Sequence, residues 1–219
     1  MGKRSSSGIT NGGGTSRSFD TKSSIDEYFR GDIESVSEYT PGNRGYKIKE
    51  DPDKPATQWM NSLTEDEKAS VNTYTGSAYD DINRYLRGQQ PYTSYKDDIS
   101  SIDGAISKFE LKDDIEVYRG MYASPELLDK LQPGRIFRDD GYGSTTTLKS
   151  SAFGGNVRME IKVRKGKGVG AYIDGLSAYE GREMEFLLAR GAKYKIKSRE
   201  LVNGKYVVKA EIIGFKETK

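Results

Sequence analysis

The sequence predicts an α+β fold in which helices come first and antiparallel strands follow. Apolar residues recur at helical spacing in the first half of the chain and alternate with polar residues in most of the second half. Helices followed by strands are typical of an α+β domain and argue against a doubly wound fold. At 219 residues the chain is long enough for one such domain and short for two.

Composition narrows the chemistry and the partners. The chain has no cysteine and no histidine, so catalysis would depend on carboxylates, hydroxyls and Arg or Lys, and no metal is expected. The net charge is only +2, so we expect neither nucleic acid nor an anionic membrane as partner. No apolar run has the length of a secretory signal or a membrane span, so we expect a soluble protein, and a monomer.

Three regions follow one another along the chain. Residues 1–24 are almost entirely Gly, Ser, Thr, Asn, Lys and Arg, which predicts a flexible tail. Residues 25–55 read as a poorly defined, turn-rich extension that begins with a short helical turn. The folded catalytic domain is predicted to occupy residues 56–219.

The helices are predicted from their start signals and apolar stripes. Thr64-Glu65-Asp66-Glu67 forms a capping box, and the stripe that follows predicts a helix up to about residue 86, with Gly76 as its weak point. A second helix is predicted around 99–109. A third begins at Ser124-Pro125, a cap followed by proline at the first helical position.

The strands are predicted from alternation with a period of two, first at 115–119 and then at 157–164. Further strands are expected at 134–138, 142–147, 171–173, 183–189, 193–199 and 205–214. Asn203-Gly204, between the last two, is a strong signal for a tight hairpin.

Two glutamates near residue 184 form the first candidate site. Residues two apart on a strand point to the same face about 6.5–7 Å apart, so Glu183 and Glu185 are expected to project together. Carboxylates this close raise the pKa of at least one of them. A Glu-x-Glu can also be an ordinary solvated face, so this motif alone decides nothing.

Two other segments have the same ambiguity. Arg119 is either a strand-end residue that reaches water or a fork of donors suited to a diphosphate. Ser144, followed by three threonines, is either part of a β-prone run or a hydroxyl that orients a neighbouring carboxylate.

The three segments in this order resemble the signature of the arginine-specific mono-ADP-ribosyltransferases, an Arg, a Ser-Thr-Ser and a Glu-x-Glu on successive strands around NAD. The helix that contains Tyr74 and Tyr79 is similar to the tyrosine helix of the bacterial toxin and bacteriophage members, and Ser151-Ala152-Phe153 to their nicotinamide loop. The resemblance covers about 160 residues. It implies helices packed on a two-sheet, mainly antiparallel β-sandwich of the ADP-ribosyltransferase type.

The resemblance also implies roles for these residues. Arg119, with Gly120 beside it, would hold the diphosphate of NAD, while Ser144 fixes the rotamer of Glu185. Glu185 would stabilise the oxocarbenium-like charge that forms as nicotinamide leaves. The cofactor-binding set is completed by Tyr74, Tyr79 and Phe153.

The resemblance likewise implies the acceptor. Glu183, where asparagine-modifying relatives have glutamine, implies transfer to an arginine of a target protein. The loop at 174–182 would meet that target through Tyr179, which could equally be a loop aromatic packed on the domain.

The sequence departs from the family pattern at two places. Ser-Thr-Ser is Ser144-Thr145-Thr146 here, which keeps the first serine. Many relatives have a second phosphate-binding arginine shortly after the phenylalanine, where this chain has Gly154-Gly155-Asn156. Arg158 is the candidate substitute.

Two other functions stay open at this point. An NAD glycohydrolase, in which water accepts the ribose, would use the same Glu185 and Arg119 and would not need Glu183. A non-catalytic NAD-binding or structural module would keep the fold without turnover. The expected place of action is the cytoplasm of a host cell, as a phage protein or a delivered effector.

Overall fold

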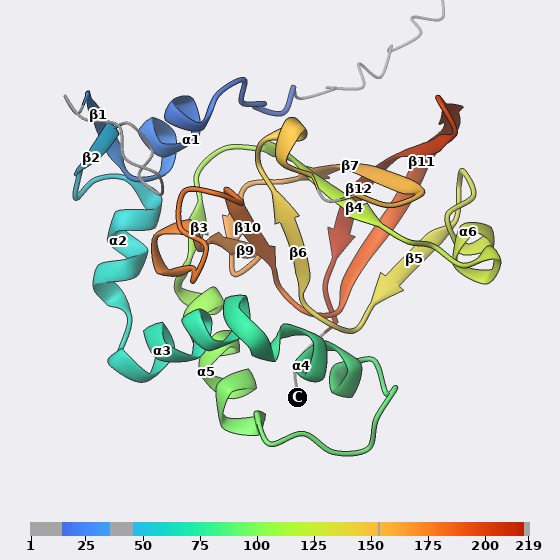
Figure 1. The fold of residues 1–219 in the computed structure, drawn as a ribbon, viewed down its shortest axis with the longest axis horizontal. Coiled ribbons are helices and arrows are strands. Elements are labelled where there is room, and N and C mark those ends of the chain that lie inside the picture. The colour runs from blue at the N-terminus through green and yellow to red at the C-terminus, as the bar shows by residue number, and fades with distance from the viewer. Residues whose placement is uncertain (1–14, 36–45, 153, 217–219) are drawn as a thin grey trace, which may run out of the picture.

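The computed structural model describes residues 15–35, 46–152 and 154–216, and its arrangement of helices and strands is shown in Figure 1. The helices are α1 (Lys22–Phe29), α2 (Pro55–Ser62), α3 (Glu65–Thr73), the π-helical turn η1 (Tyr74–Ala78), α4 (Tyr79–Leu86), α5 (Lys96–Lys108), α6 (Pro125–Lys130) and the 3-10 turns η2 (Lys149–Ser151) and η3 (Asp174–Leu176). The strands are β1 (Gly31–Ser35), β2 (Tyr46–Glu50), β3 (Glu110–Leu111), β4 (Ile115–Met121), β5 (Ile136–Asp139), β6 (Gly143–Thr146), β7 (Val157–Val163), β8 (Gly166–Lys167), β9 (Gly170–Tyr172), β10 (Glu185–Leu188), β11 (Ala192–Val202) and β12 (Lys205–Gly214). The α+β prediction is confirmed. No helix within these described ranges is long and apolar enough to cross a membrane.

The main sheet of the described chain has eight strands in the order β5-β11-β12-β7-β4-β6-β10-β9, antiparallel except where β12 runs parallel to β7. Strands β4 and β6 are joined by the single residue pair Tyr118 and Thr146. The two sheets that the resemblance implied are therefore two parts of one hydrogen-bonded sheet, five strands on one side of this junction and three on the other (Figure 1). Helices α2 to α5 lie along one side of it.

The helix predicted from Thr64 begins there and is then interrupted. Thr64 Oγ1 accepts the N–H of Glu67, and Glu67 Oε2 accepts the N–H of Thr64, which completes the predicted capping box. The helix does not run unbroken to residue 86, because residues Tyr74–Ala78 widen into the turn η1 around Gly76. Glycine has a low helix propensity, and π-turns of this kind are frequent at functional sites.

The N-terminal region packs on the domain over more of its length than the sequence predicted. The flexible tail was expected to reach residue 24, whereas Phe19 is buried, Thr21 caps α1, and α1 begins at Lys22. Phe29 is fully buried and stacks on Tyr172 of β9 with 4.3 Å between ring centroids. This segment is therefore part of the core.

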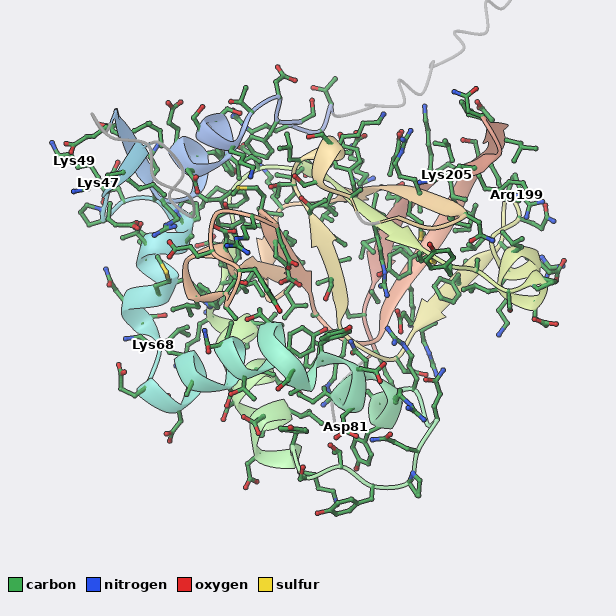
Figure 2. The ribbon with its side chains drawn as sticks, in the orientation of Figure 1. Lys47, Lys49, Lys68, Asp81, Arg199 and Lys205 are labelled. Carbon is green, nitrogen blue, oxygen red and sulfur yellow. The ribbon has the colours of Figure 1, made fainter. Side chains whose placement is uncertain are left out.

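The hairpin predicted at Asn203-Gly204 is confirmed, since both residues have positive φ, 51° and 76°. Figure 2 shows Arg199 and Lys205 near this hairpin, at the opposite side of the molecule from Lys47 and Lys49 on β2.

Candidate functional site

The centre of the site is a line of hydrogen bonds that ends at Glu185. Glu185 is the first residue of β10 and pairs with Thr146 of β6, while Ser144 of β6 pairs with Leu187. The Ser144 hydroxyl lies beside the Glu185 carboxylate and lowers its pKa by hydrogen bonding to the ionised form. The hydroxyl of Tyr74 lies 3.3 Å from Ser144 Oγ. The register of two neighbouring strands and the turn η1 thus bring three predicted site residues together.

Asn83 sets the direction of this line. Its Oδ1 accepts the backbone N–H of Tyr142 at 2.8 Å, and its Nδ2 donates to the hydroxyl of Tyr74 at 2.9 Å. Since the Tyr74 oxygen accepts from Asn83, its own proton can go to Ser144, and the proton of Ser144 can go to Glu185. A line with this polarity favours the ionised carboxylate of Glu185 and fixes its position.

Burial opposes that ionisation. Glu185 is only 5% exposed. Burial is the main reason that its pKa is raised from the usual 4.5 to about 8, and the negative charges of Glu183 and Asp174 contribute to this increase, whereas the Ser144 hydrogen bond works in the other direction. A cation bound against Glu185 would therefore be strongly favoured, because it would restore the carboxylate form.

The strand predicted over residues 183–189 is wrong at its start. Met184 has φ of 50°, and β10 begins one residue later, at Glu185. The backbone turns at a fully buried methionine, whose carbonyl accepts both the N–H and the hydroxyl of Thr147, at 3.0 and 3.1 Å. The two glutamates therefore do not share one strand face, and the prediction that they project together from one strand is wrong. Glu183 is half-buried, burial raises its pKa, and its charge still acts on Glu185.

A buried carboxylate holds two arginines beside this line. Asp139, the last residue of β5, accepts Arg87 Nε at 2.7 Å and Arg87 Nη2 at 3.0 Å, and Arg119 Nη1 at 3.2 Å. Burial alone raises the pKa of Asp139, but the guanidinium groups of Arg87 and Arg119 hold it below its usual value. Asp139, Arg87 and Arg119 together have a net charge of +1. Because Arg119 gives Asp139 one nitrogen where Arg87 gives two, the Arg119 fork can still bind an anion such as a diphosphate.

Arg158 does not lie beside Arg119. On β7 it pairs with Gly120 of β4, so its side chain is on the opposite sheet face from that of Arg119. Its Nη2 contacts Glu160 at 3.3 Å. It therefore cannot serve as a second arginine for the same phosphate group.

Residues 154–156, where many relatives have the second arginine, have a structural role in this chain. Gly155 has φ of 130°, and a Cβ there would lie 2.1 Å from the backbone oxygen of Met121. The side chain of Asn156 holds the backbone of Ala123, accepting its N–H at 2.7 Å and donating to its oxygen at 2.9 Å. Position 155 therefore excludes the arginine that many relatives have in this region.

The remaining predicted residues are distributed around this centre. Gly120 follows Arg119 in β4. Tyr79, the first residue of α4, is 53% exposed, and Tyr179, in the loop before the glutamates, is 42% exposed. Phe153 lies outside the described residues, so its expected contact with nicotinamide stays a prediction.

Three site residues were missed from the sequence. Asn83 of α4 and Arg87, the residue that caps the C-terminus of α4, are four apart, so they lie on the same side of the helix and could have been found by extending the tyrosine helix. Asp139 had no local signal, because its partners come from α4 and β4. Over the part of the chain that the structure describes, no group of three or more His, Cys, Asp or Glu side chains could hold a metal ion.

Comparison with known proteins gives consistent matches. Residues 52–214 match the family model described as ADP-ribosyltransferase exoenzyme. The chain is 31% identical over 164 residues to the NAD(+)--arginine ADP-ribosyltransferase EFV of Enterococcus faecalis, a match that covers 68% of this chain and 31% of that protein. This chain thus spans less than a third of that relative's length.

Solved structures give the same result. Plx2a, an ADP-ribosyltransferase toxin from Paenibacillus larvae, is 29% identical with a TM-score of 0.61, over 73% of this chain and 92% of that chain. The ADP-ribosyltransferase Vis of Vibrio splendidus in complex with agmatine is 26% identical with a TM-score of 0.60, over 70% of this chain and 76% of that chain.

Proposed function

Since the chain belongs to the ADP-ribosyltransferase exoenzyme family, we propose that it transfers ADP-ribose from NAD to an arginine side chain of a target protein. The observation that carries the proposal is the hydrogen-bonded line from Asn83 through Tyr74 and Ser144 to a buried Glu185. A buried carboxylate that is oriented by a serine, close to a second glutamate and an arginine pair, suits the cleavage of a cationic glycoside. The residues responsible are those of the domain proposed for 56–219.

NAD fits this arrangement by charge. Its nicotinamide ring is cationic, so binding it near Glu185 favours the ionised carboxylate that burial disfavours. Its diphosphate is anionic and suits the guanidinium fork of Arg119. Cleavage sends the electron pair of the glycosidic bond to the nicotinamide nitrogen, which leaves as a neutral ring. No general acid is needed for that departure, in agreement with a chain that has no histidine.

As that bond breaks, positive charge develops on the ribose, as in glycoside cleavage. The preorganised Glu185 carboxylate would stabilise this charge through a ribose hydroxyl, and Ser144 would keep it in place. A fixed carboxylate does this better than a mobile one, because no reorganisation is required at the moment of reaction.

Glu183 supports arginine as the acceptor. A free guanidinium stays protonated in water, so the acceptor needs a carboxylate that aligns it and takes its proton as the new C–N bond forms. Burial raises the pKa of Glu183, which makes it a better base than an exposed glutamate. Similar proteins agree: one is named for arginine transfer, and Vis has a structure with agmatine, a small guanidine.

The alternatives differ from this proposal in single features. An NAD glycohydrolase would need Glu185 and Arg119 but not Glu183. A non-catalytic module would have no reason to keep the Ser144 hydrogen bond to Glu185. We further propose that the chain works as a monomer in a host cell's cytoplasm, as a phage protein or a delivered effector.

The test combines NAD, agmatine and candidate proteins from bacterial and eukaryotic lysates, with products read by mass spectrometry. We expect ADP-ribosyl-agmatine and a labelled target with the parent chain, free ADP-ribose as the main product of Glu183→Gln, and almost no NAD consumption with Glu185→Gln. Free ADP-ribose alone from the parent would establish the glycohydrolase. No NAD consumption at all would establish the non-catalytic module.

A further inference from the structure

The loop at 174–182, which we call the acceptor loop, is attached to the N-terminal segment of the chain. Lys22 Nζ donates to the backbone oxygen of Gly181 at 3.0 Å. Arg30 Nη1 donates to Glu180 Oε1 at 2.9 Å. Both basic residues precede residue 52, where the match to the family model begins. We call Lys22 and Arg30 the brace.

Arg30 contacts the acceptor loop at both of its ends. Its side chain is only 10% exposed and lies between two carboxylates, Glu180 of the loop and Glu50 of β2. A Cβ added to Gly175, near the start of the loop, would lie 3.2 Å from Arg30 Cζ. The guanidinium therefore packs against the first turn of the loop and pairs with its far end.

Helix α1, which begins at Lys22 and is capped by Arg30, is itself fixed. Phe29 stacks on Tyr172, the last residue of β9, and the Tyr172 hydroxyl donates to the buried Asp26 of α1 at 3.1 Å. Because α1 is packed on the strand that leads into the acceptor loop, the brace can restrain the loop relative to the sheet.

The loop is also closed on itself, with its aromatic residue outside. Both oxygens of Asp174 accept the N–H of Gly181, at 3.1 and 3.0 Å. Asn72 of α3 donates to the backbone oxygen of Leu176 at 2.9 Å. Tyr179 remains 42% exposed at the surface of this closed loop. The loop therefore presents Tyr179 at the surface, next to the exposed Ala178 and Glu180, from a backbone that is held at several points.

We propose that Lys22 and Arg30 are positioning residues, which hold the acceptor loop so that an incoming guanidinium reaches Glu183 in the geometry for transfer. The proposal rests on the proposed function and extends it to the N-terminal segment. Transfer to a guanidine requires a positioned acceptor, whereas water can attack from many directions. The brace therefore favours transfer over hydrolysis of NAD and acts without contact to NAD.

The experiment uses the full chain with NAD and agmatine, and compares Glu180→Ala and Lys22→Ala with Glu50→Ala. Glu50→Ala is the matched control, because it removes the other carboxylate of Arg30 and leaves the bond to the loop. Mutation of the Glu180 side is preferable to mutation of Arg30, which would leave two carboxylates without their shared partner. The readouts are the ratio of ADP-ribosyl-agmatine to free ADP-ribose, and hydrogen exchange of the amides at 175–182.

We expect Glu180→Ala and Lys22→Ala each to lower the ratio by about two- to fivefold, the size of one partly exposed contact to a charged group, and to speed exchange in the acceptor loop. Glu50→Ala should stay within about twofold of the parent. The proposal would be overturned if neither Glu180→Ala nor Lys22→Ala changed the ratio, or if Glu50→Ala lowered it equally.

Failure of the proposed function gives a different pattern. A parent chain that hydrolyses NAD and never modifies agmatine would refute arginine transfer and with it the effect on transfer. The exchange data would then decide whether the brace holds the loop. A merely destabilised variant would lose transfer and hydrolysis together, and its ratio would not change.

Discussion

Replacing Glu185 by glutamine should make the protein more stable, and increasingly so as pH rises. In the folded protein the pKa of Glu185 is raised from 4.5 to about 8, chiefly by burial. The folded state therefore keeps its proton over a pH range in which the unfolded chain releases it. Stability from this group is fully present below about pH 4.5 and is lost as pH rises through about pH 8.

The size of the effect follows from the same pKa difference. Each pKa unit corresponds to about 1.4 kcal/mol, so the unfolding free energy of the parent should fall by up to about 5 kcal/mol between pH 4.5 and pH 8 because of this one group. Glutamine has the same shape, can accept the Ser144 hydrogen bond and does not titrate. The free energy difference between variant and parent should therefore grow by about 1.4 kcal/mol per pH unit in that window and stay level outside it.

The assay is reversible urea unfolding of both proteins at several pH values. Trp59 is the single tryptophan of the chain, is 2% exposed and packs edge-on against Phe109, so its fluorescence reports on the core. Glu65→Gln, at a side chain that is 89% exposed on α3, provides the baseline for replacing a carboxylate by an amide. Stability curves of Glu185→Gln and parent that run parallel from pH 4.5 to pH 8 would refute the assignment of a buried, raised-pKa carboxyl to this position.

Three further changes test the rest of the site. Ser144→Ala removes the hydroxyl that lowers the pKa of the buried Glu185. The acidic limb of the kcat/KM profile for NAD cleavage should therefore move to higher pH, and kcat/KM at pH 7 should fall by about tenfold. An unmoved profile would contradict this role. Arg119→Lys should raise the KM for NAD by about tenfold or more because the planar fork is lost, while Arg158→Lys should leave it unchanged; equal effects of the two would show that they share one site. Gly155→Ala should lower the unfolding free energy by about 1–3 kcal/mol, because its Cβ would lie 2.1 Å from a backbone oxygen of β4. Gly154→Ala is the control, since a Cβ there meets nothing within 4 Å. Equal melting temperatures of the two variants would argue against this strain.

Features that depend on neighbours in the sequence were the ones that could be predicted. The capping box at Thr64 and the tight turn at Asn203-Gly204 are both local, and both are confirmed. The order of helices and strands follows from apolar periodicity, which reports on burial along each element. The resemblance to a family supplied the pairing of Ser144 with Glu185, which no local pattern indicates.

Features that depend on tertiary partners could not be predicted. Phe19 lies in a stretch of polar composition, yet it is buried because the rings of Tyr28 and Phe29 pack against it. Asp139 looks like an ordinary strand-end aspartate until Arg87 and Arg119 converge on it from other elements. Periodicity cannot reveal such contacts, because it describes one element at a time.

Two local irregularities of the backbone explain why predictions based on a regular helix and a regular strand were wrong at the site. Regular patterns predicted an unbroken helix through Gly76 and an unbroken strand through Met184, and the backbone departs from both. Each departure adjoins a residue of the proposed mechanism. The π-turn begins at Tyr74, and the left-handed residue separates Glu183 from Glu185. Irregular backbone of this kind is retained where it aims side chains that a regular element would point elsewhere.

The π-turn also joins the two halves of the proposed reaction. Within it, Tyr74 reaches Ser144, while the next residue, Thr75, accepts the N–H of Ala178 in the acceptor loop at 3.0 Å. A Cβ on Gly76 would lie 4.0 Å from the Cβ of Ala178, so the turn packs directly on the loop. We therefore expect a shift of η1 that moves the Tyr74 hydroxyl to move the acceptor loop as well. In the proposed reaction, this contact would link the binding of NAD to the positioning of the acceptor.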